Sequence, residues 1–217
     1  MEQYINKIIH ADCMDILKEL PDKCIDLVLT DPPYGIGEAR GKNTSRGKLA
    51  KATDYGIKDW DNKIPDKRYF DEIKRISKNQ IIFGGNYFVE YLNNSPCWLV
   101  WDKNNTGDFA DCELAWTNFK SAVRKYKWTW NGMLQEDMKH KDIRIHPTQK
   151  PLGLFQMILN DYSNENDLIL DCFSGSGTTA VACHNLKRRF ICIEKDYDYW
   201  KASVERLKIA QAQLKLF

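Results

Sequence analysis

Asp31-Pro32-Pro33-Tyr34 is the stretch of this sequence whose residue types and spacing best fit a chemical task. It follows an apolar run, residues 25–30, that predicts a buried strand. The two prolines restrict the backbone and remove two N–H donors, so the corner offers a carboxylate, free carbonyl groups and an aromatic ring. Such a corner suits the binding of a flat group that has N–H bonds to donate. Taken alone, it also fits an ordinary turn, because Asp and Pro favour turns for local reasons.

A glycine-rich turn, residues 171–180, lies between a predicted buried strand at Leu168–Leu170 and a helix expected from Thr178 onward. Glycines there allow a tight turn and a close approach of the backbone to a ligand. Glu194 ends the next predicted strand, where an acid typically accepts hydrogen bonds from ribose hydroxyls. Strand, turn, helix and spaced acid together predict a nucleoside-binding unit rather than a plain turn.

Asp171 bears on the identity of that nucleoside. Gly175-x-Gly177-x-x-Ala180 also fits the dinucleotide fingerprint in its Gly/Ala form, so NAD is a rival cofactor. A carboxylate at position 171 would repel a pyrophosphate at the following helix N-terminus and attract a cationic ligand. S-adenosylmethionine carries a sulfonium and an α-ammonium group and no phosphate. The local charge therefore favours S-adenosylmethionine.

Short apolar strands alternate with helices along the chain, which predicts an α/β fold with a mostly parallel sheet and helices on both faces. The expected strands are residues 4–10, 25–30, 80–83, 97–102, 112–119, 121–130, 168–170 and 190–193. Helices are expected at 14–20, around 69–76, around 87–92, and from Pro151, from Thr178 and near Trp200 onward.

Composition sets broader limits. A chain of 217 residues with 43% hydrophobic residues fits one α/β domain with insertions, and a formal net charge of +2 says little about partners. The seven cysteines include no Cys-x-x-Cys pair, which argues against a zinc site and against a complete disulfide framework. We expect no metal. The sequence shows no signal peptide and no apolar run of membrane-spanning length, so we expect a cytoplasmic protein without a membrane partner.

Three segments together resemble the amino-DNA methyltransferases of the β class, which methylate adenine N6 or cytosine N4. They are Asp31 to Tyr34, His146-Pro147-Thr148-Gln149-Lys150-Pro151, and Asp171 to Thr179, in the order typical of that class. The resemblance extends from Ile8 to about Trp200 and is weak over residues 103–145. It implies a Rossmann-like, circularly permuted S-adenosylmethionine-dependent methyltransferase fold. We expect a single domain, 1–217, with a mobile loop at about 37–59 and a small target-recognition insertion at about 103–145.

The permuted order would place the strand that Asp12 follows beside the strand that Glu194 ends. Because parallel strands end at one edge of a sheet, Asp12, Asp31, Asp171 and Glu194 should surround one crevice. Asp12 also fits as the N-cap of the next helix, and the two roles are compatible. By the resemblance, His146 is structural, and the cofactor is held by Asp12, Asp31, Thr148, Lys150, Asp171, Phe173, Gly175, Gly177, Thr178 and Glu194.

The resemblance implies double-stranded DNA as the substrate and Asp31, Pro32, Pro33 and Tyr34 as the catalytic residues. Asp31 and the Pro32 carbonyl would accept hydrogen bonds from the target amino group and favour the charge that develops on its nitrogen. The base must be flipped out of the duplex, and Tyr34 would stack on it. Asp at position 31 is typical of adenine N6 and Ser of cytosine N4. Adenine N6 is therefore favoured, with cytosine N4 and adenine in RNA as alternatives.

Two basic segments are expected to meet DNA phosphates. The first is the loop 37–59, although a solvated charged run would look the same, and its candidate residues are Arg40, Lys42, Arg46 and Lys48. The second is the segment 120–150, and its candidate residues Arg124, Lys125 and Lys127 lie on the predicted strand 121–130. Because this recognition element is small, either the recognised site is short or a partner subunit, as in a homodimer, adds specificity.

Aromatic residues alternate along the same predicted strand, at Tyr126, Trp128 and Trp130. They could stack on bases, but strict alternation favours a half-buried strand. Two rivals come from other classes of protein: an NAD-dependent enzyme and a non-catalytic nucleic-acid-binding module. Asp171 argues against the first. The cofactor crevice argues against the second, because a pure binding module has no use for one.

Overall fold

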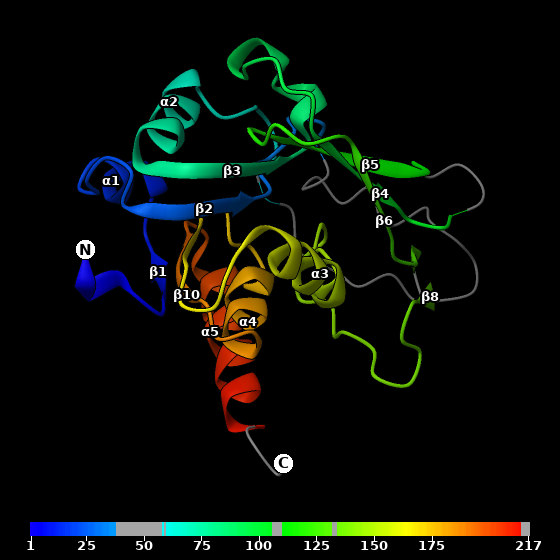
Figure 1. Cartoon of the computed structure of the whole chain (residues 1–217). Coiled ribbons are helices and arrows are strands. Elements are labelled where there is room, and N and C mark those ends of the chain that lie inside the picture. Colours follow the sequence, from blue (N-terminus) through cyan, green and yellow to red (C-terminus); the bar gives the residue numbers. More distant parts are fainter. Residues whose placement is uncertain (38–57, 59, 106–109, 132–133, 214–217) are drawn as a thin grey trace.

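The computed structural model describes residues 1–37, 58, 60–105, 110–131 and 134–213, and its largest element is an eight-stranded sheet (Figure 1). The strand order is β1-β10-β9-β2-β3-β5-β4-β6. The parallel part consists of β1 (Lys7–His10), β10 (Arg189–Glu194), β9 (Leu168–Asp171), β2 (Ile25–Thr30) and β3 (Ser77–Phe83).

The other part of the sheet is mixed. The strand β5 (Cys112–Thr117) runs antiparallel to β3 and to β4 (Trp98–Asp102). The last strand, β6 (Arg124–Lys127), runs parallel to β4. A separate two-stranded ribbon pairs β7 (Trp130–Asn131) with β8 (Leu134–Gln135).

Helices cover both faces of the sheet, with α1 and α2 on one side and α3, α4 and α5 on the other (Figure 1). Their bounds are α1 (Cys13–Leu17), α2 (Lys67–Ile76), α3 (Leu152–Tyr162), α4 (Thr178–Asn185) and α5 (Tyr197–Ala212). Strand residues alternate between the two cores: Leu27 and Leu29 pack in one, and Val28 packs in the other. Because β2 is buried on both faces, its sequence is almost continuously apolar.

The predicted α/β fold is confirmed, and so is its permuted order. The first strand of the chain, β1, pairs in parallel with the last, β10. The C-terminal ends of β1, β10, β9 and β2 therefore meet along one edge, where Asp12, Glu194, Asp171 and Asp31 lie at or just beyond the strand ends. In the part of the chain that the structure describes, no helix is both long and apolar enough to cross a bilayer.

Several expected elements differ from the structure. The strand expected at 4–10 covers only Lys7–His10, and Tyr4 belongs to a 3-10 turn. The helix expected at 14–20 is a short one, Cys13–Leu17, which Asp12 caps by accepting a hydrogen bond from the Met14 amide at 3.0 Å. The helix expected around 87–92 is a pair of 3-10 turns, η4 (Gly85–Tyr87) and η5 (Val89–Tyr91), and a third, η1 (Glu2–Tyr4), precedes β1. The strand expected at 121–130 joins the large sheet only over β6, and its last residue, Trp130, belongs to β7 of the separate ribbon. Beyond β6, the Trp128 ring packs so closely on Gly153 in the first turn of α3 that a Cβ there would lie 2.1 Å from it.

Candidate functional site

A cavity of about 760 Å³ opens where the parallel strands end. The structure brings all four strand-end carboxylates, Asp12, Asp31, Asp171 and Glu194, into its wall. Of the other residues expected to hold a cofactor, those in the wall are Thr148, Lys150, Phe173, Gly175 and Thr178. Residues from five separate segments of the chain thus share one concave surface of a size typical for small-molecule sites.

Gly177 lies outside this wall. Its φ is +71°, and a Cβ at this position would lie 2.9 Å from the Cβ of Ser203 and 3.2 Å from Ile8. Glycine is therefore needed here for the close packing of α4 against α5 and β1. The sequence could not distinguish this packing role from ligand contact, because both require a residue without a side chain.

The glycine-rich turn is held by the two acids that flank it. Asp171 accepts hydrogen bonds from the hydroxyls of Thr30 at 2.8 Å and Thr179 at 2.5 Å. Burial raises the pKa of Asp171 to about 6 despite these bonds. Glu194 accepts hydrogen bonds from the Gly175 amide at 2.7 Å and from the Asp196 amide at 2.7 Å. Glu194 thus shapes the turn directly, and burial raises its pKa as well.

Asp12 and Phe173 form the wall beside the turn. The Asp12 carboxylate caps α1 and also accepts a hydrogen bond from the Tyr69 hydroxyl at 3.2 Å. Lys195 donates to its second oxygen at 2.8 Å. The ring of Phe173 packs 5.7 Å from that of Tyr69, centroid to centroid. Asp12 therefore both caps α1 and lines the cavity, and the sequence had indicated that the two roles are compatible.

The corner after β2 places Asp31 and Pro33 in the cavity wall, while Pro32 is buried and is not part of that wall. The Tyr34 hydroxyl donates a hydrogen bond to one Asp31 oxygen at 2.6 Å, and the Lys150 ammonium donates to the other at 2.5 Å. Tyr34 itself is not part of the cavity wall. Its ring stacks on Tyr87, with centroids 4.8 Å apart and planes 13° apart. The Asp31 carboxylate is thus held by two hydrogen bonds, one to each of its oxygens.

Glu113 is a member of the site that sequence reasoning missed. It lies on β5, and its carboxylate oxygens are 3.2 Å from the Lys150 ammonium and 2.5 Å from that of Lys103. Asp31, Lys150, Glu113 and Lys103 therefore form a row of alternating charges. An acid within the apolar strand predicted at 112–119 was the available signal, because a charge placed there needs a partner.

The pKa values in this row reflect burial and charge together. Burial raises the pKa of Asp31, even though the Lys150 ammonium opposes that shift. Burial would also raise the pKa of Glu113, but the charges of Lys150 and Lys103 hold it below its usual range. For Lys150, burial is outweighed by Asp31 and Glu113, which raise its pKa. The lysine is therefore charged at neutral pH.

Lys150 ends a segment that also places His146 and Thr148 in the wall. The sequence indicated a structural role for His146; in the structure its ring packs 4.2 Å from that of Tyr199 and 5.0 Å from that of Trp60. Burial, with the nearby charge of Lys150, lowers the pKa of His146 to about 3, so the ring is neutral. Its Nδ1 accepts a hydrogen bond from the Thr148 amide at 3.3 Å.

The predicted DNA contacts divide into two groups. Arg124, Lys125 and Lys127 are exposed on β6, where Lys125 lies 3.3 Å from Asp102. Arg40, Lys42, Arg46 and Lys48 lie outside the described residues. Among the residues that are described, no cluster of His, Cys, Asp and Glu is arranged to hold a metal ion.

The aromatic residues beside β6 pack within the protein. Tyr126 is buried and donates a hydrogen bond to Asp161 at 2.6 Å. Trp128 packs on Gly153, and the Arg144 guanidinium lies 4.3 Å from the ring of Trp130. The half-buried interpretation of these rings agrees with the structure.

Comparisons with known proteins agree with this geometry. The family model of N6/N4 DNA methylases matches residues 99–205. The chain is 27% identical to the type II methyltransferase M.HinfI of Haemophilus influenzae, over 96% of this chain and 70% of the relative. It is also 27% identical to the type II methyltransferase M2.DpnII of Streptococcus pneumoniae, over 94% of this chain and 92% of the relative.

Solved structures show the same fold. A complex of M1.HpyAVI with S-adenosylmethionine has a TM-score of 0.57 at 27% identity, covering 93% of this chain and 99% of that one. The PvuII cytosine-N4-specific DNA methyltransferase has a TM-score of 0.60 at 14% identity, covering 95% and 91%, and shows the fold alone. With the permuted sheet and the shared cavity, these similarities support the resemblance of the chain to the N6/N4 DNA methyltransferase family.

Proposed function

We propose that this protein transfers a methyl group from S-adenosylmethionine to the exocyclic N6 amino group of a flipped-out adenine at specific sites in double-stranded DNA. The observation that carries the proposal is that Asp31 and the glycine-rich turn line one cavity. The corner at Asp31, which suits an amino group, and the glycine-rich turn, which suits a nucleoside, therefore face the same cavity. Asp rather than Ser at position 31 favours adenine over cytosine.

The cavity fits S-adenosylmethionine. Carboxylates of Asp12, Asp171 and Glu194 line it, and two of the nearby cations are paired with acids, with Lys195 2.8 Å from Asp12 and Lys58 2.6 Å from Asp196. Such a wall favours a ligand with sulfonium and ammonium groups over one with a pyrophosphate. When bound, S-adenosylmethionine supplies a methyl group on a positively charged sulfur. The residues proposed to hold it are Asp12, Thr148, Lys150, Asp171, Phe173, Gly175, Thr178 and Glu194, while Asp31 in the same wall serves mainly the amino group.

The protein's own part in the reaction is to position and polarise the amino group. Asp31 and the Pro32 carbonyl would accept its two N–H bonds, which orients the nitrogen and favours positive charge on it in the transition state. Each Asp31 oxygen already accepts one hydrogen bond, from Tyr34 or from Lys150, and retains a further lone pair. Those two partners hold the carboxylate at a fixed angle while the substrate binds.

Methyl transfer itself tests the proposal. Purified protein is incubated with methyl-labelled S-adenosylmethionine and with duplex DNA or RNA, and the nucleic acid is digested to nucleosides. We expect label on N6-methyl-2′-deoxyadenosine from DNA. Label on N4-methylcytosine would overturn the choice of base, label in RNA alone would overturn the choice of substrate, and no label from a folded protein would overturn the transferase proposal.

Recognition of DNA is proposed to involve the exposed residues of β6 and the basic residues of loop 37–59. The exposed guanidinium and ammonium groups on β6 suit contact with phosphates. A homodimer as the recognising unit stays a prediction, which sedimentation of the protein with and without duplex DNA would test.

A further inference from the structure

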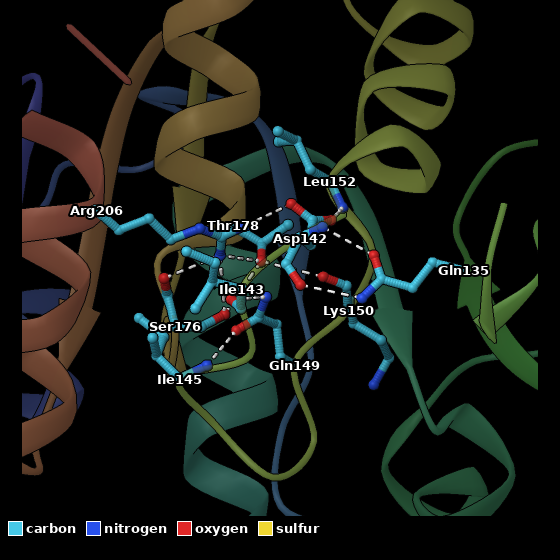
Figure 2. Close-up of polar contacts among 10 residues, drawn as sticks. All are labelled: Gln135, Asp142, Ile143, Ile145, Gln149, Lys150, Leu152, Ser176, Thr178 and Arg206. Atoms are coloured by element: carbon cyan, nitrogen blue, oxygen red, sulfur yellow. Dashed lines mark hydrogen bonds and ion pairs between the residues drawn. The ribbon is translucent and has the colours of Figure 1, made fainter. Parts of the chain in front are cut away.

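Residues 136–150 contain no helix or strand, although all of them are described by the structure. Two glutamine side chains hold this segment in shape (Figure 2). Gln135 donates a hydrogen bond to the Asp142 carbonyl at 3.0 Å and accepts one from the Asp142 amide at 2.8 Å. Gln149 does the same with the Ile143 carbonyl and the Ile145 amide, both at 3.0 Å. The segment is therefore internally ordered but needs an external anchor to stay on the cavity.

Arg206 of α5 provides that anchor. Its side chain is only 15% exposed. The guanidinium donates hydrogen bonds to the Ser176 carbonyl at 3.1 Å and to the Thr178 hydroxyl at 2.9 Å, both in the glycine-rich turn. The same guanidinium reaches Asp142 at 3.4 Å. One side chain thus joins the glycine-rich turn to the segment that carries Gln149 and Lys150 (Figure 2).

Asp142 and Thr178 continue the connection to Lys150. The second carboxylate oxygen of Asp142 accepts a hydrogen bond from the Leu152 amide at 3.0 Å, at the start of α3. The Thr178 hydroxyl donates to the Lys150 carbonyl at 3.2 Å. The main chain around Lys150 is therefore held at the Lys150 carbonyl and at the Leu152 amide. The Lys150 ammonium donates a hydrogen bond to Asp31.

We propose that Arg206 and Asp142 are positioning residues for methyl transfer, which together hold residues 143–152 against the glycine-rich turn so that Lys150 reaches Asp31. Arg suits this task because its planar fork serves several acceptors at once. A simpler role, in which Arg206 only fastens α5 to α4, would not involve Asp142. The proposal rests on the proposed function, because the cavity that it shapes is the one assigned to S-adenosylmethionine.

The first test needs no ligand. Arg206→Met is compared with Lys208→Met, which removes an exposed charge from the same helix. Hydrogen exchange should become faster in residues 143–152 of Arg206→Met, where the Ile145 and Leu152 amides lose protection, while α4 and α5 stay protected. Unchanged exchange in 143–152, or faster exchange confined to α5, would overturn the positioning role.

The second test is binding of S-adenosylmethionine by calorimetry. We expect Arg206→Met to weaken binding about tenfold, Asp142→Asn to weaken it severalfold, and the double variant to be no weaker than Arg206→Met. Additive losses in the double variant, or unchanged affinity in Arg206→Met, would count against a shared role. If Arg206→Met does not fold, Arg206→Lys, which keeps the charge but not the fork, should fold and show an intermediate loss. A folded, unmodified protein that does not bind S-adenosylmethionine would instead overturn the proposed function, whatever the exchange data show.

Discussion

The ammonium of Lys150 lies 2.5 Å from a carboxylate oxygen of Asp31, although 119 positions separate the two residues in the chain. This contact joins the proline-rich corner to the segment 146–150. Glu113, on a third element, lies 3.2 Å from the same ammonium. The proposed catalytic carboxylate is therefore part of a buried charge cluster, whose members should depend on one another.

Removal of the central cation tests that dependence. Lys150→Met leaves Asp31 and Glu113 without their shared partner, and breaking a buried ion pair in this way costs about 3–5 kcal/mol of stability. The loss of stability should be larger at pH 8 than at pH 5. Without the lysine, the pKa values of both carboxyls rise, so at pH 5 they can take up protons, whereas at pH 8 they must stay ionised. Urea unfolding at both pH values measures it, with Lys78→Met, at an exposed ion pair, as the control. An equal loss at both pH values would contradict the prediction.

Asp31 is expected to act on the amino group and not to be essential for cofactor binding. Asp31→Asn should lower kcat by about 100-fold or more, since a placed charge that acts in the transition state is typically worth that much. Its affinity for S-adenosylmethionine should change only a few-fold. Single-turnover methylation and calorimetry measure the two quantities. Tyr34→Phe is the matched control, because it keeps the ring and removes only the hydroxyl that donates a hydrogen bond to Asp31. Loss of binding in Asp31→Asn would transfer Asp31 to a cofactor role.

Asp171 should make cofactor binding depend on pH. Its pKa is raised to about 6, so the ionised form that attracts a cation becomes populated as the pH rises from 5 to 7. The affinity for S-adenosylmethionine should rise over that range, and in Asp171→Asn it should be weaker and depend less on pH. Calorimetry at pH 5, 6 and 7 checks this. An unchanged pH dependence in the variant would show that another group is responsible.

The carboxyl of Asp171 should also make the stability of the folded state depend on pH, with stability falling as the pH rises. A raised pKa means that the folded state binds the proton more tightly than the unfolded state. The stabilisation is therefore present below pH about 4 and is lost as the pH rises through about 6. The difference between 3.8 and about 6 corresponds to about 3 kcal/mol. Without ligand, Asp171→Asn should be at least as stable as the unmodified protein at pH 8 by urea unfolding. A marked loss at pH 8 would mean that the hydrogen bonds from Thr30 and Thr179 outweigh the cost of the buried charge.

The position of Tyr34 should depend on Gly84. Gly84 has a φ of +67°, and a Cβ there would lie 2.1 Å from the Tyr34 ring. Gly84→Ala should cost about 1–2 kcal/mol through the backbone alone and should displace the ring proposed to stack on the target base. We expect weaker fluorescence enhancement from 2-aminopurine at the target position and unchanged affinity for S-adenosylmethionine. Normal base flipping in a folded Gly84→Ala variant would show that Tyr34 is not needed there.

The exposed cations of β6 should contribute to DNA binding through phosphates. Replacing Arg124, Lys125 and Lys127 with Ser should weaken DNA binding and lower the slope of log K against log salt by about 2–3, at roughly 0.9 per phosphate contact. Fluorescence anisotropy at several salt concentrations measures the slope. The control is a triple Ser variant of the exposed lysines Lys18, Lys201 and Lys208. Equal slopes for the two variants would mean that β6 has no special part in binding.

Much of the parallel half of the sheet could be predicted from sequence. The strand at β2 has the predicted bounds, Ile25–Thr30, because a strand buried on both faces must be apolar along its length. The strand expected at 121–130 is longer than the observed β6, because its regular alternation continues past Lys127, where Trp128 packs on Gly153 and Trp130 pairs with Gln135 in the separate ribbon. Local periodicity contains no information about such a contact.

The carboxylates that end the strands, and the edge of the sheet that they share, follow from the sequence, because the order and direction of parallel strands place their C-terminal ends together. The pairing of those charges depends on the folded chain. Lys150 forms ion pairs with Asp31 and Glu113. Arg206 joins Asp142 to the glycine-rich turn. In both cases the partners are far apart in the chain. A buried charge must find a partner, but the partner is set by the packing of distant elements, and no local pattern records it.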